Sequence, residues 1–577
     1  MIARAGPTWT APGRARFSLW APGRESVGLE LDGAPAQAMD ALGEGWFGLE
    51  TKASPGSRYR FRLDEALAVP DPAGQALDSD VHGWSLLVDH GAYQWRHADW
   101  PGRPWSDAVL YEVHCGVMGG FEGLADRLPD LARLGVTALQ LMPVNAFSGA
   151  RNWGYDGVLP YALAPAYGSP EQLKALVDTA HGLGMMVLLD VVYNHFGPDG
   201  NYLPLYAGAF FDQDRKTPWG PAIAFGTPAV ARYFIDNALY WLETYKLDGL
   251  RFDAVHAIGD NAFLDAMAAE IRSRIVERPI HLVLENEAND AARLTAGFDA
   301  QWNDDFHNVV HVLLTDETSS YYQDFADRPA ERLARCLAEG FIYQGQPSPN
   351  HDGRPRGLSS GCLPPTAFVN FLQNHDQVGN RALGERLTRL VSPERLQAAM
   401  GLLLLCPQIP MLFMGEEDGS ASPFLFFTDF HDALADAVRE GRRREFAKFP
   451  AFADPQARAA IPDPNAKETF EASRPQPGAN AAAWRALTSH LLRLRREHLA
   501  PHIETAMSLG AEAIGAKAVQ ASWRLETKTF TLAVNLGDEP AVLPASPEGP
   551  PLAVVGAAPS GGLLAPASFV AWLEAAP

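Results

Sequence analysis

The sequence predicts an α/β protein in which a (β/α)8 TIM barrel is flanked by an N-terminal β-sandwich and a C-terminal all-β domain. Strand-like and helix-like segments alternate from about residue 105 to residue 500, and the strand-like segments number eight. Such a series favours a closed parallel barrel over an open sheet. Both ends of the chain contain short strand-like runs instead. We therefore expect domains at 1–92, 93–502 and 503–577.

The N-terminal segment predicts a small sandwich of two sheets. The runs FSLWAP, VGLELDG, WFGLE and YRFRLDE alternate apolar and polar residues, and Pro, Gly and Asp separate them. Trp20, Trp46 and Tyr59 would form either a sugar-binding platform or the sandwich core, and the core is favoured because aromatic residues commonly fill small cores. The Pro-, Asp- and Gly-rich stretch 68–85 predicts the connection to the barrel.

The barrel prediction follows from the order of elements. Residues 109–115 and 136–144 are apolar runs typical of buried parallel strands, and leucines at helical spacing lie between them. Asp260 predicts the N-cap of a helix that presents Phe263 and Met267 on one face. Further helices are expected at 171–184 and 233–246, and further strands at 185–195, 247–255, 281–286, 298–304 (the weakest), 368–376 and 409–417.

The region after the barrel predicts a helix over 481–498 and β-structure beyond about residue 503. Segment 451–480 is rich in Ala, Pro and Asp, so we expect an exposed loop there.

Composition restricts the partners and the compartment. Apolar residues make up 47% of the chain and charged residues 20%, which excludes wholesale disorder. The formal net charge of −22 argues against nucleic acid and anionic membranes as partners. No apolar leader-like run opens the chain, and the most apolar stretch, 401–415, is short and contains two prolines. We expect a cytoplasmic enzyme.

The cysteine pattern agrees with a reducing compartment. The four cysteines lie far apart without a C-x-x-C pair, which argues against a disulfide framework or a zinc site and leaves a single bridge open. Buried small residues are the favoured interpretation of all four. Their positions are Cys115, Cys336, Cys362 and Cys406.

Reactive groups of a barrel enzyme lie at the carboxyl ends of its strands, so polar residues that end apolar strands are candidates. Three such carboxylates, without a metal-binding cluster, suit glycosyl transfer because its oxocarbenium-like transition state needs nearby negative charge. Like charges and burial separate carboxyl pKa values, so that an acid and a nucleophile coexist. We expect no cofactor and no metal. The candidates are Asn194, His195, Arg251, Asp253, His256, Glu285, His375 and Asp376.

Four of these segments carry a family resemblance. DVVYNH, GLRFDAVH, the Glu after LVL, and NHD occur in this order and resemble the four signature regions of the α-amylase family of glycoside hydrolases. The resemblance implies that Asp253 is the nucleophile and Glu285 the general acid/base of a retaining mechanism. It also implies that Asp376 holds sugar hydroxyls and that Arg251 keeps Asp253 ionised.

The resemblance further implies a set of substrate-binding residues. His195 and His375 would bind hydroxyls of the sugar that is cleaved, and Tyr155 would stack on its apolar face. Glu287 is a minor alternative to Glu285 as the acid, and Asp190 is better explained as a brace for its loop. The other expected substrate-binding residues are His256, Trp219 (sugar platform or lid anchor), Asn289 and Phe427 (substrate wall or core).

Within the family, the finer resemblance is to the malto-oligosyltrehalose trehalohydrolases. SPFLFFTDF (422–430) followed by REGRRREF (439–446) is the most discriminating pair of segments. The resemblance implies a glucan-binding-module-like N-domain, malto-oligosyltrehalose and related α-glucans as substrates, trehalose as the product, and malto-oligosyltrehalose synthase as a functional partner. The sequence departs from the pattern at Asn308, Asp418 and Phe430.

Three alternatives are left open. A glycogen branching or debranching enzyme, or a general α-glucan hydrolase, would share the carboxylates and differ in its products. A noncatalytic glucan-binding scaffold is the remote alternative, because such a protein has no need for buried, mutually repelling carboxylates.

Overall fold

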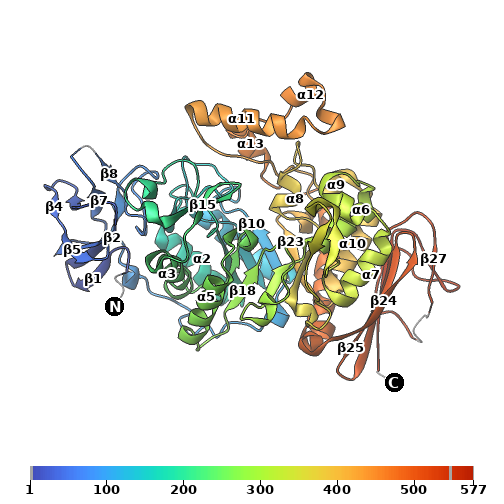
Figure 1. The fold of residues 1–577 in the computed structure, drawn as a ribbon. Helices are drawn as coiled ribbons and strands as arrows, with labels where there is room; N and C mark the ends of the chain where they lie inside the picture. The colour runs from blue at the N-terminus through green and yellow to red at the C-terminus, as the bar shows by residue number, and fades with distance from the viewer. Residues whose placement is uncertain (1–3, 66, 545–548, 576–577) are drawn as a thin grey trace.

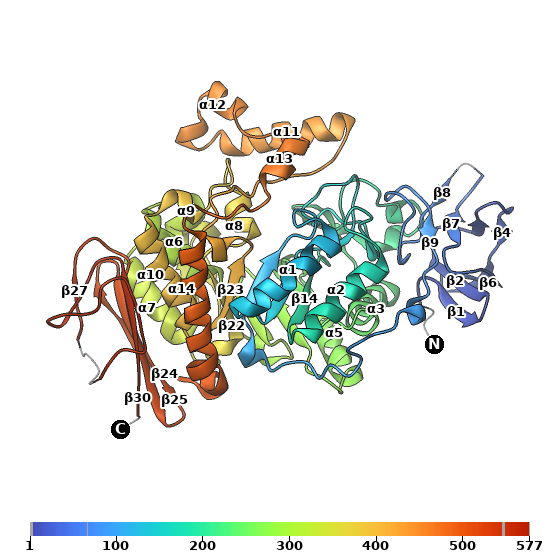
Figure 2. The ribbon, with the colours of Figure 1, turned by 180° about the vertical axis from the view of Figure 1, so that it is seen from behind.

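The computed structural model describes residues 4–65, 67–544 and 549–575. A small β-rich N-terminal part, a central barrel and a C-terminal sheet follow one another along the molecule (Figures 1 and 2). A layer of three helices lies beside the barrel, away from the N-terminal part and the C-terminal sheet; it consists of α11 (Asp432–Phe446), α12 (Pro455–Ala459) and α13 (Lys467–Ala472). The predicted fold class is confirmed.

The N-terminal part contains two antiparallel sheets. Tyr59 is fully buried between them, as the core interpretation predicts. Trp20 and Trp46 instead line a narrow gap toward barrel residues that include Phe210 and Tyr233, so they pack between the sandwich and the barrel. One sheet has the order β1 (Thr8–Ala11), β2 (Arg14–Trp20), β6 (Trp46–Lys52), β5 (Asp40–Gly43), and the other contains β4 (Gln37–Ala38), β3 (Gly28–Leu31), β7 (Arg58–Arg62), β8 (Ala68–Val69) and β9 (Ser85–Leu86).

Eight parallel strands close the barrel, and every predicted barrel strand is present, including the short β19. Each strand is fully buried, which explains its unbroken apolar pattern. The strand order is β10 (Leu110–Val113), β11 (Ala138–Leu141), β14 (Met186–Val191), β17 (Gly249–Phe252), β18 (His281–Leu284), β19 (Ala300–Trp302), β22 (Phe368–Phe371) and β23 (Ile409–Phe413).

Helices connect these strands around the outside. Asp260 caps α5 as predicted, because its side chain accepts a hydrogen bond from the Phe263 N–H at 2.9 Å. The main helices are α1 (Gly120–Leu134), α2 (Pro170–Gly182), α3 (Pro228–Thr244), α5 (Asn261–Arg274), α6 (Asp304–Thr315) and α10 (Pro393–Leu405).

Three long connections surround the barrel mouth. The one after β14 contains the hairpin β15 (Phe211–Thr217) and β16 (Gly220–Ile223). The second, after α6, contains a short turn of helix, η6 (Ser320–Phe325). This second connection continues with α7 (Pro329–Glu339), β20 (Gln346–Ser348) and β21 (Arg354–Arg356). The third connection follows β23 and contains α11 (Asp432–Phe446), α12 (Pro455–Ala459) and α13 (Lys467–Ala472).

The expected loop over 451–480 is therefore wrong in part. It contains α12 and α13, which are short and largely exposed. Pro455 stands in the first turn of α12, where proline is tolerated, and alanines follow it. The composition that suggested a loop thus also suits a short helix that begins with proline.

After the barrel, the predicted helix is present as α14 (Ala481–Leu494). Helix α10 packs on the C-terminal sheet, where a Cβ at Gly401 would lie only 2.7 Å from the Phe569 ring, so glycine permits this close approach. The sheet order is β24 (Met507–Gly515), β25 (Ala518–Leu525), β26 (Lys528–Asn535), β30 (Ser568–Ala575) and β28 (Ala553–Val555), with β27 (Ala541–Val542) paired to β29 (Leu563–Leu564).

All four cysteines are free, so no bridge forms among them. Cys115, Cys336 and Cys406 are buried as expected, but Cys362 is exposed, which corrects that prediction. Within the described residues, no helix is long and apolar enough to cross a membrane.

Candidate active site at the barrel mouth

Asp253 and Glu285 follow neighbouring strands, and both reach one guanidinium group. Asp253 directly follows β17, and Glu285 directly follows β18. Arg251, in β17, approaches Asp253 Oδ1 with Nη1 at 2.9 Å and Glu285 Oε2 with Nη2 at 3.0 Å. The parallel register pairs Arg251 with Val283, which places these strand ends side by side. A cation thus lies between two carboxylates that would otherwise repel each other.

Two further contacts, with Asp190 and Trp302, hold the Arg251 side chain in place. Its Nη1 contacts Asp190 Oδ2 at 2.6 Å, and its guanidinium carbon lies 4.0 Å from the centre of the Trp302 ring. The side chain is only 1% exposed. Tyr155 donates a hydrogen bond from its hydroxyl to the same Asp190 oxygen at 2.5 Å. Asp190 therefore braces the site through Arg251 and Tyr155.

The two central carboxyl groups have opposite pKa shifts. Burial raises the pKa of Asp253 well above its usual value, although Arg251 opposes this. Burial also acts to raise the pKa of Glu285, but Arg251 and the Ala254 N–H, which donates to Oε2 at 2.8 Å, hold it below its usual value. In this arrangement Glu285 is the more readily ionised partner.

Asp376 lies across the mouth, in α8 (His375–Gly379), which begins shortly after β22. His375 is buried beside it, with Nε2 3.8 Å from Asp376 Oδ1. Glu112 of β10 accepts hydrogen bonds from His375 Nδ1 at 2.6 Å and from the His375 backbone N–H at 2.9 Å. Burial alone would lower the pKa of His375, but Glu112 and Asp376 raise it to about 9.

His195 and Trp219 line a cavity on the other side of Asp253. Their rings are stacked with centroids 4.7 Å apart and an interplanar angle of 12°. Asn194 links this side to the centre, because its Nδ2 donates to Asp253 Oδ2 at 3.2 Å and its Oδ1 contacts His195 Nδ1 at 3.0 Å. The cavity has a volume of about 480 Å³ and is bordered by the β15–β16 hairpin. Trp219 is 47% exposed, which leaves its ring available to a ligand.

Tyr155 also lies at the centre of the site. Its ring stacks on His375 with centroids 4.9 Å apart. The structure therefore brings together Asp253, Glu285, Asp376, Arg251, His375 and Tyr155, with His195 and Trp219 beside them.

The other predicted residues are placed differently. His256 is exposed at the rim, where its Nδ1 accepts a hydrogen bond from the Glu287 N–H at 3.4 Å. Phe427 is fully buried against His114 and Phe424, so it contributes to the core. Asn289 is buried, and its Nδ2 donates to a carboxylate behind the site at 3.0 Å.

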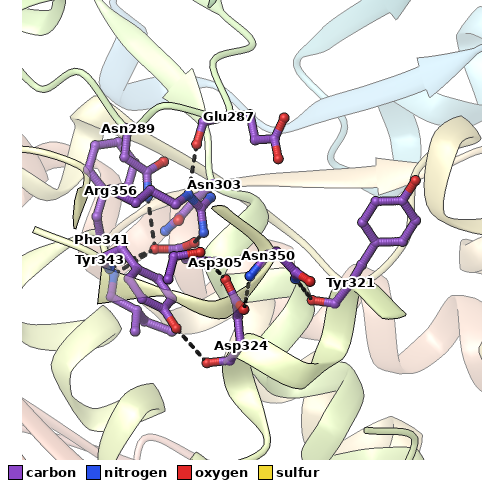
Figure 3. A network of polar contacts seen from close by, with 12 residues as sticks. Glu287, Asn289, Asn303, Asp305, Tyr321, Asp324, Phe341, Tyr343, Asn350 and Arg356 are labelled. Carbon is purple, nitrogen blue, oxygen red and sulfur yellow. Dashed lines mark hydrogen bonds and ion pairs between the residues drawn. The ribbon is translucent and has the colours of Figure 1, made fainter. Parts of the chain in front are cut away.

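That carboxylate, Asp305, is the centre of a polar network that extends through Arg356 to the backbone of Glu287 (Figure 3). Its Oδ2 also accepts hydrogen bonds from the backbone N–H groups of Ile342 and Tyr343 at 2.8 and 3.1 Å. Arg356 pairs with its Oδ1 at 3.1 Å and donates to the Glu287 carbonyl at 2.8 Å. The network therefore fixes the chain that follows Glu285.

Sequence reasoning missed two residues of the mouth. Glu112 interrupts the apolar run of β10, and this polar residue within a buried strand was a readable signal. Tyr321 is 70% exposed beside the site, and no periodicity marked it. Partial burial in the cleft, followed by the charges of Glu445, Asp376 and Glu287, raises the pKa of the Tyr321 hydroxyl. The Tyr321 hydroxyl thus lies within electrostatic range of Asp376 and Glu287.

The three departures from the family pattern are all buried. Phe430 is 4% exposed. Asp418 is 6% exposed and pairs with Arg485 of α14. Asn308 is 9% exposed within α6. Among the described residues, no group of His, Cys, Asp and Glu is arranged to hold a metal ion.

Comparisons with known proteins identify the family. The chain is 41% identical over 503 residues to the malto-oligosyltrehalose trehalohydrolase of Deinococcus radiodurans, covering 84% of this chain and 82% of that protein. It is 40% identical over 442 residues to the Saccharolobus solfataricus enzyme of the same name, covering 74% and 78%. The chain belongs to the malto-oligosyltrehalose trehalohydrolase family.

Structural and family-model matches agree with this membership. A crystal structure of an alpha-amylase-type protein from Salmonella typhimurium is 46% identical, with a TM-score of 0.93 over 99% of this trehalohydrolase-family chain and 100% of that one. The alpha amylase catalytic domain model matches residues 77–205, and a domain of unknown function, DUF3459, matches residues 507–572.

Proposed function

We propose that this protein hydrolyses the α-1,4-glucosidic bond next to the terminal trehalose of malto-oligosyltrehalose, releases α,α-trehalose and retains the anomeric configuration. The observation that carries the proposal is the pair of carboxylates, Asp253 and Glu285, on either side of the buried Arg251 guanidinium in a trehalohydrolase-family barrel. Retaining glycosidases place two carboxyl groups about 5–5.5 Å apart, so that one attacks while the other protonates.

In the first step Asp253 attacks C1 of the glucose next to trehalose. Glu285 gives its proton to the departing O4, and trehalose leaves while a glycosyl ester forms on Asp253. In the second step Glu285 takes a proton from water, the water oxygen attacks C1, and the ester bond breaks. The maltodextrin is released with its α configuration, because two inversions restore it.

The proton donor must be neutral before the first step. The contacts of Glu285 with Arg251 and the Ala254 N–H favour its ionised form. We infer that the substrate draws the Glu285 carboxyl away from both donors toward the leaving oxygen, where burial would raise its pKa. Asp253 keeps its contacts with Arg251 and Asn194, which stabilise its ionised form. Substrate binding would thereby reverse the order of the two pKa values.

Asp376 and His375 would bind hydroxyls of the same sugar from the opposite wall. Glu112, which pairs with His375 Nδ1, favours the imidazolium form of His375, and this form is a hydrogen-bond donor at Nε2. Tyr155 would contact the apolar face of the sugar from its stacked position on His375. Hydrogen bonds that strengthen as the ring flattens would stabilise the transition state.

The leaving trehalose would lie beside Glu285, because the proton donor must reach the leaving oxygen. Glu287 and His256, which follow Glu285 and Asp253 along the chain, and Tyr321 are exposed residues that we place on that side. Glu287 and His256 offer hydroxyl-binding groups, and Tyr321 offers an apolar ring face. Phe427, for which both a substrate wall and a core position are predicted, is fully buried and therefore offers no surface to the trehalose. Trp219 and His195 would border the glucan chain across the nucleophile.

The metabolic setting is part of the proposal. We propose that a malto-oligosyltrehalose synthase supplies the substrate, and that the protein acts in the cytoplasm. A fractionation experiment with an antibody against the chain would test the second point, and its recovery with membranes or in the medium would contradict it.

Product analysis tests the function against its rivals. Purified protein would be given maltotetraosyl-trehalose and, separately, maltohexaose, with Glu285→Gln as the matched inactive variant. Rapid release of trehalose from the first substrate, lost in the variant, is the expected result. Equal cleavage of both substrates would indicate a general α-glucan hydrolase, and longer or branched products would indicate a branching enzyme. No turnover of either would favour the binding scaffold.

A further inference from the structure

The segments 422–430 and 439–446, which most distinguish this sequence, do not themselves supply a reacting group. Segment 439–446 is the second half of α11, and segment 422–430 leads into that helix. Arg442, in segment 439–446, donates a hydrogen bond to the Gly379 carbonyl at the end of the short helix α8, which carries Asp376. The same guanidinium lies over the ring of Phe426, in segment 422–430. Their relation to Asp376 therefore suggests a function for them.

Arg442 is a buried contact between α11 and the chain after α8. Its side chain is 8% exposed, and its guanidinium carbon lies 5.3 Å from the Phe426 ring centre and 4.7 Å from that of Phe446. Nη2 donates to the Gly379 carbonyl at 2.6 Å and to the Arg381 carbonyl at 3.2 Å. The guanidinium thus satisfies carbonyl groups that the end of α8 leaves free.

Between these two carbonyls lies Asn380, which joins Arg442 to Asp376. Arg442 Nη1 donates to Asn380 Oδ1 at 3.5 Å, and Asn380 Nδ2 donates to Asp376 Oδ1 at 2.9 Å. A guanidinium only donates, so its presence fixes the amide with oxygen toward Arg442 and nitrogen toward Asp376. The Asn380 N–H also donates to the Asp376 carbonyl at 2.9 Å. Asn380 therefore holds both the backbone and the carboxylate of Asp376.

Segment 422–430 packs against Trp153, which in turn supports α8 and His375. Trp153 stacks on Phe424 with centroids 5.3 Å apart and meets Phe426 edge-on at 5.2 Å. Its Nε1 donates to the Leu425 carbonyl at 2.9 Å, and its ring meets His375 at 5.5 Å. A Cβ on Gly379 would lie 2.1 Å from Trp153, so the last residue of α8 packs directly on this ring.

We infer that Arg442, acting through Asn380, orients the Asp376 carboxylate for the reaction, so that segments 422–430 and 439–446 serve as the support of the site. Both are positioning residues, since neither touches the reacting atoms. The inference rests on the proposed function, in which Asp376 binds the sugar that undergoes reaction. The Arg442 guanidinium packs on Phe426, donates to the Gly379 carbonyl at the end of α8, and orients the Asn380 amide. These shared contacts explain why the two segments occur together.

The experiment compares Arg442→Met, Asn380→Ala and the double variant with the wild-type enzyme, on maltotetraosyl-trehalose. Arg443→Met is the matched control, because Arg443 lies on the same helix and pairs only with Glu440, at 3.0 Å, among the described residues. We expect each single variant to lower kcat about tenfold with KM changed less than twofold, because misorientation of Asp376 weakens a transition-state interaction. The double variant should be no worse than the poorer single variant, and Arg442→Lys should recover part of kcat.

Several results would overturn the inference. Unchanged kcat in Asn380→Ala, losses that multiply in the double variant, or an equal loss in Arg443→Met would each show that Arg442 has a packing role only. A rise in KM alone would lead to the same conclusion. If Arg442→Met strongly lowers the melting temperature, the kcat of Asn380→Ala decides between the positioning role and a packing role, because Asn380 is exposed and lies outside α11. Failure of the wild-type protein to release trehalose would instead refute the proposed function.

Discussion

The ion pair between Glu112 and His375 permits a quantitative test of the electrostatics behind the site. Both side chains are almost fully buried, with His375 Nδ1 2.6 Å from Glu112 Oε1. The substitution Glu112→Gln keeps the shape and a hydrogen-bond acceptor but removes the charge. We expect the His375 imidazole to become neutral, because burial and the nearby Arg251 then oppose its protonation.

The magnitude follows from the pKa of His375, which rises from 6.5 to about 9 in the folded protein. Because one pKa unit corresponds to 1.36 kcal/mol, the imidazolium contributes about 3 kcal/mol to the free energy of unfolding. A raised folded-state pKa means that this contribution is fully present below pH 6.5 and is lost as the pH rises through about 9. The wild-type advantage over Glu112→Gln should therefore be largest near pH 6 and should fade by about pH 9.5.

The assay is the difference in melting temperature between wild type and variant across this pH range. For a chain of this length, about 3 kcal/mol corresponds to a shift of about 2–4 °C. The same comparison in a His375→Gln background is the control, and the pH-dependent difference should disappear there. A difference that is constant with pH, or that grows above pH 9, would refute the assignment of an imidazolium to His375.

Three further predictions concern the mouth. Arg251→Lys should lower kcat at least a hundredfold and destabilise the protein, because one ammonium group replaces a planar fork that contacts three carboxylates; steady-state kinetics and thermal melts check this. Tyr321→Ala should raise KM about three- to tenfold for maltotetraosyl-trehalose and less for maltohexaose, whereas equal effects on both would contradict a role on the trehalose side. Trp219→Ala should weaken the binding of both substrates equally, since the Trp219 ring borders the cavity on the far side of Asp253. Isothermal titration of each substrate into the inactive Glu285→Gln protein, with and without Trp219→Ala, measures this binding.

The barrel could be predicted from sequence because each of its strands is buried on both faces. A run such as IPMLF in β23 has no polar side to confuse the pattern, and α-helices separate successive strands everywhere except between β18 and β19. The central carboxylates could be predicted for the same reason. A charged residue at the end of an apolar strand, such as Asp253 after β17, stands out against its surroundings.

The surroundings of the site were less predictable because they depend on contacts between distant segments. Phe427 and Asn289 lie in motifs that suggested substrate binding, yet one is core and the other hydrogen-bonds Asp305. Tyr321 stands on a short turn whose position is set by Asp324, because the Asn350 N–H donates to Asp324 Oδ1 and the Asn350 side chain holds the Tyr321 carbonyl (Figure 3). No local pattern reports such a contact across 29 residues.

The charges at the mouth explain why the site suits a cationic transition state. Asp190 balances Arg251, and Glu112 balances the imidazolium of His375. In the substrate-bound state that we propose, Asp253 and Asp376 face the sugar without a full counter-charge of their own, and Glu285 has taken up the proton that it will donate. An oxocarbenium-like centre that develops between them supplies the missing positive charge. Burial and, to a smaller extent, the neighbouring carboxylates raise the pKa of both aspartates. This cost of ionising them is tolerated because their negative charge stabilises the transition state more than the neutral substrate.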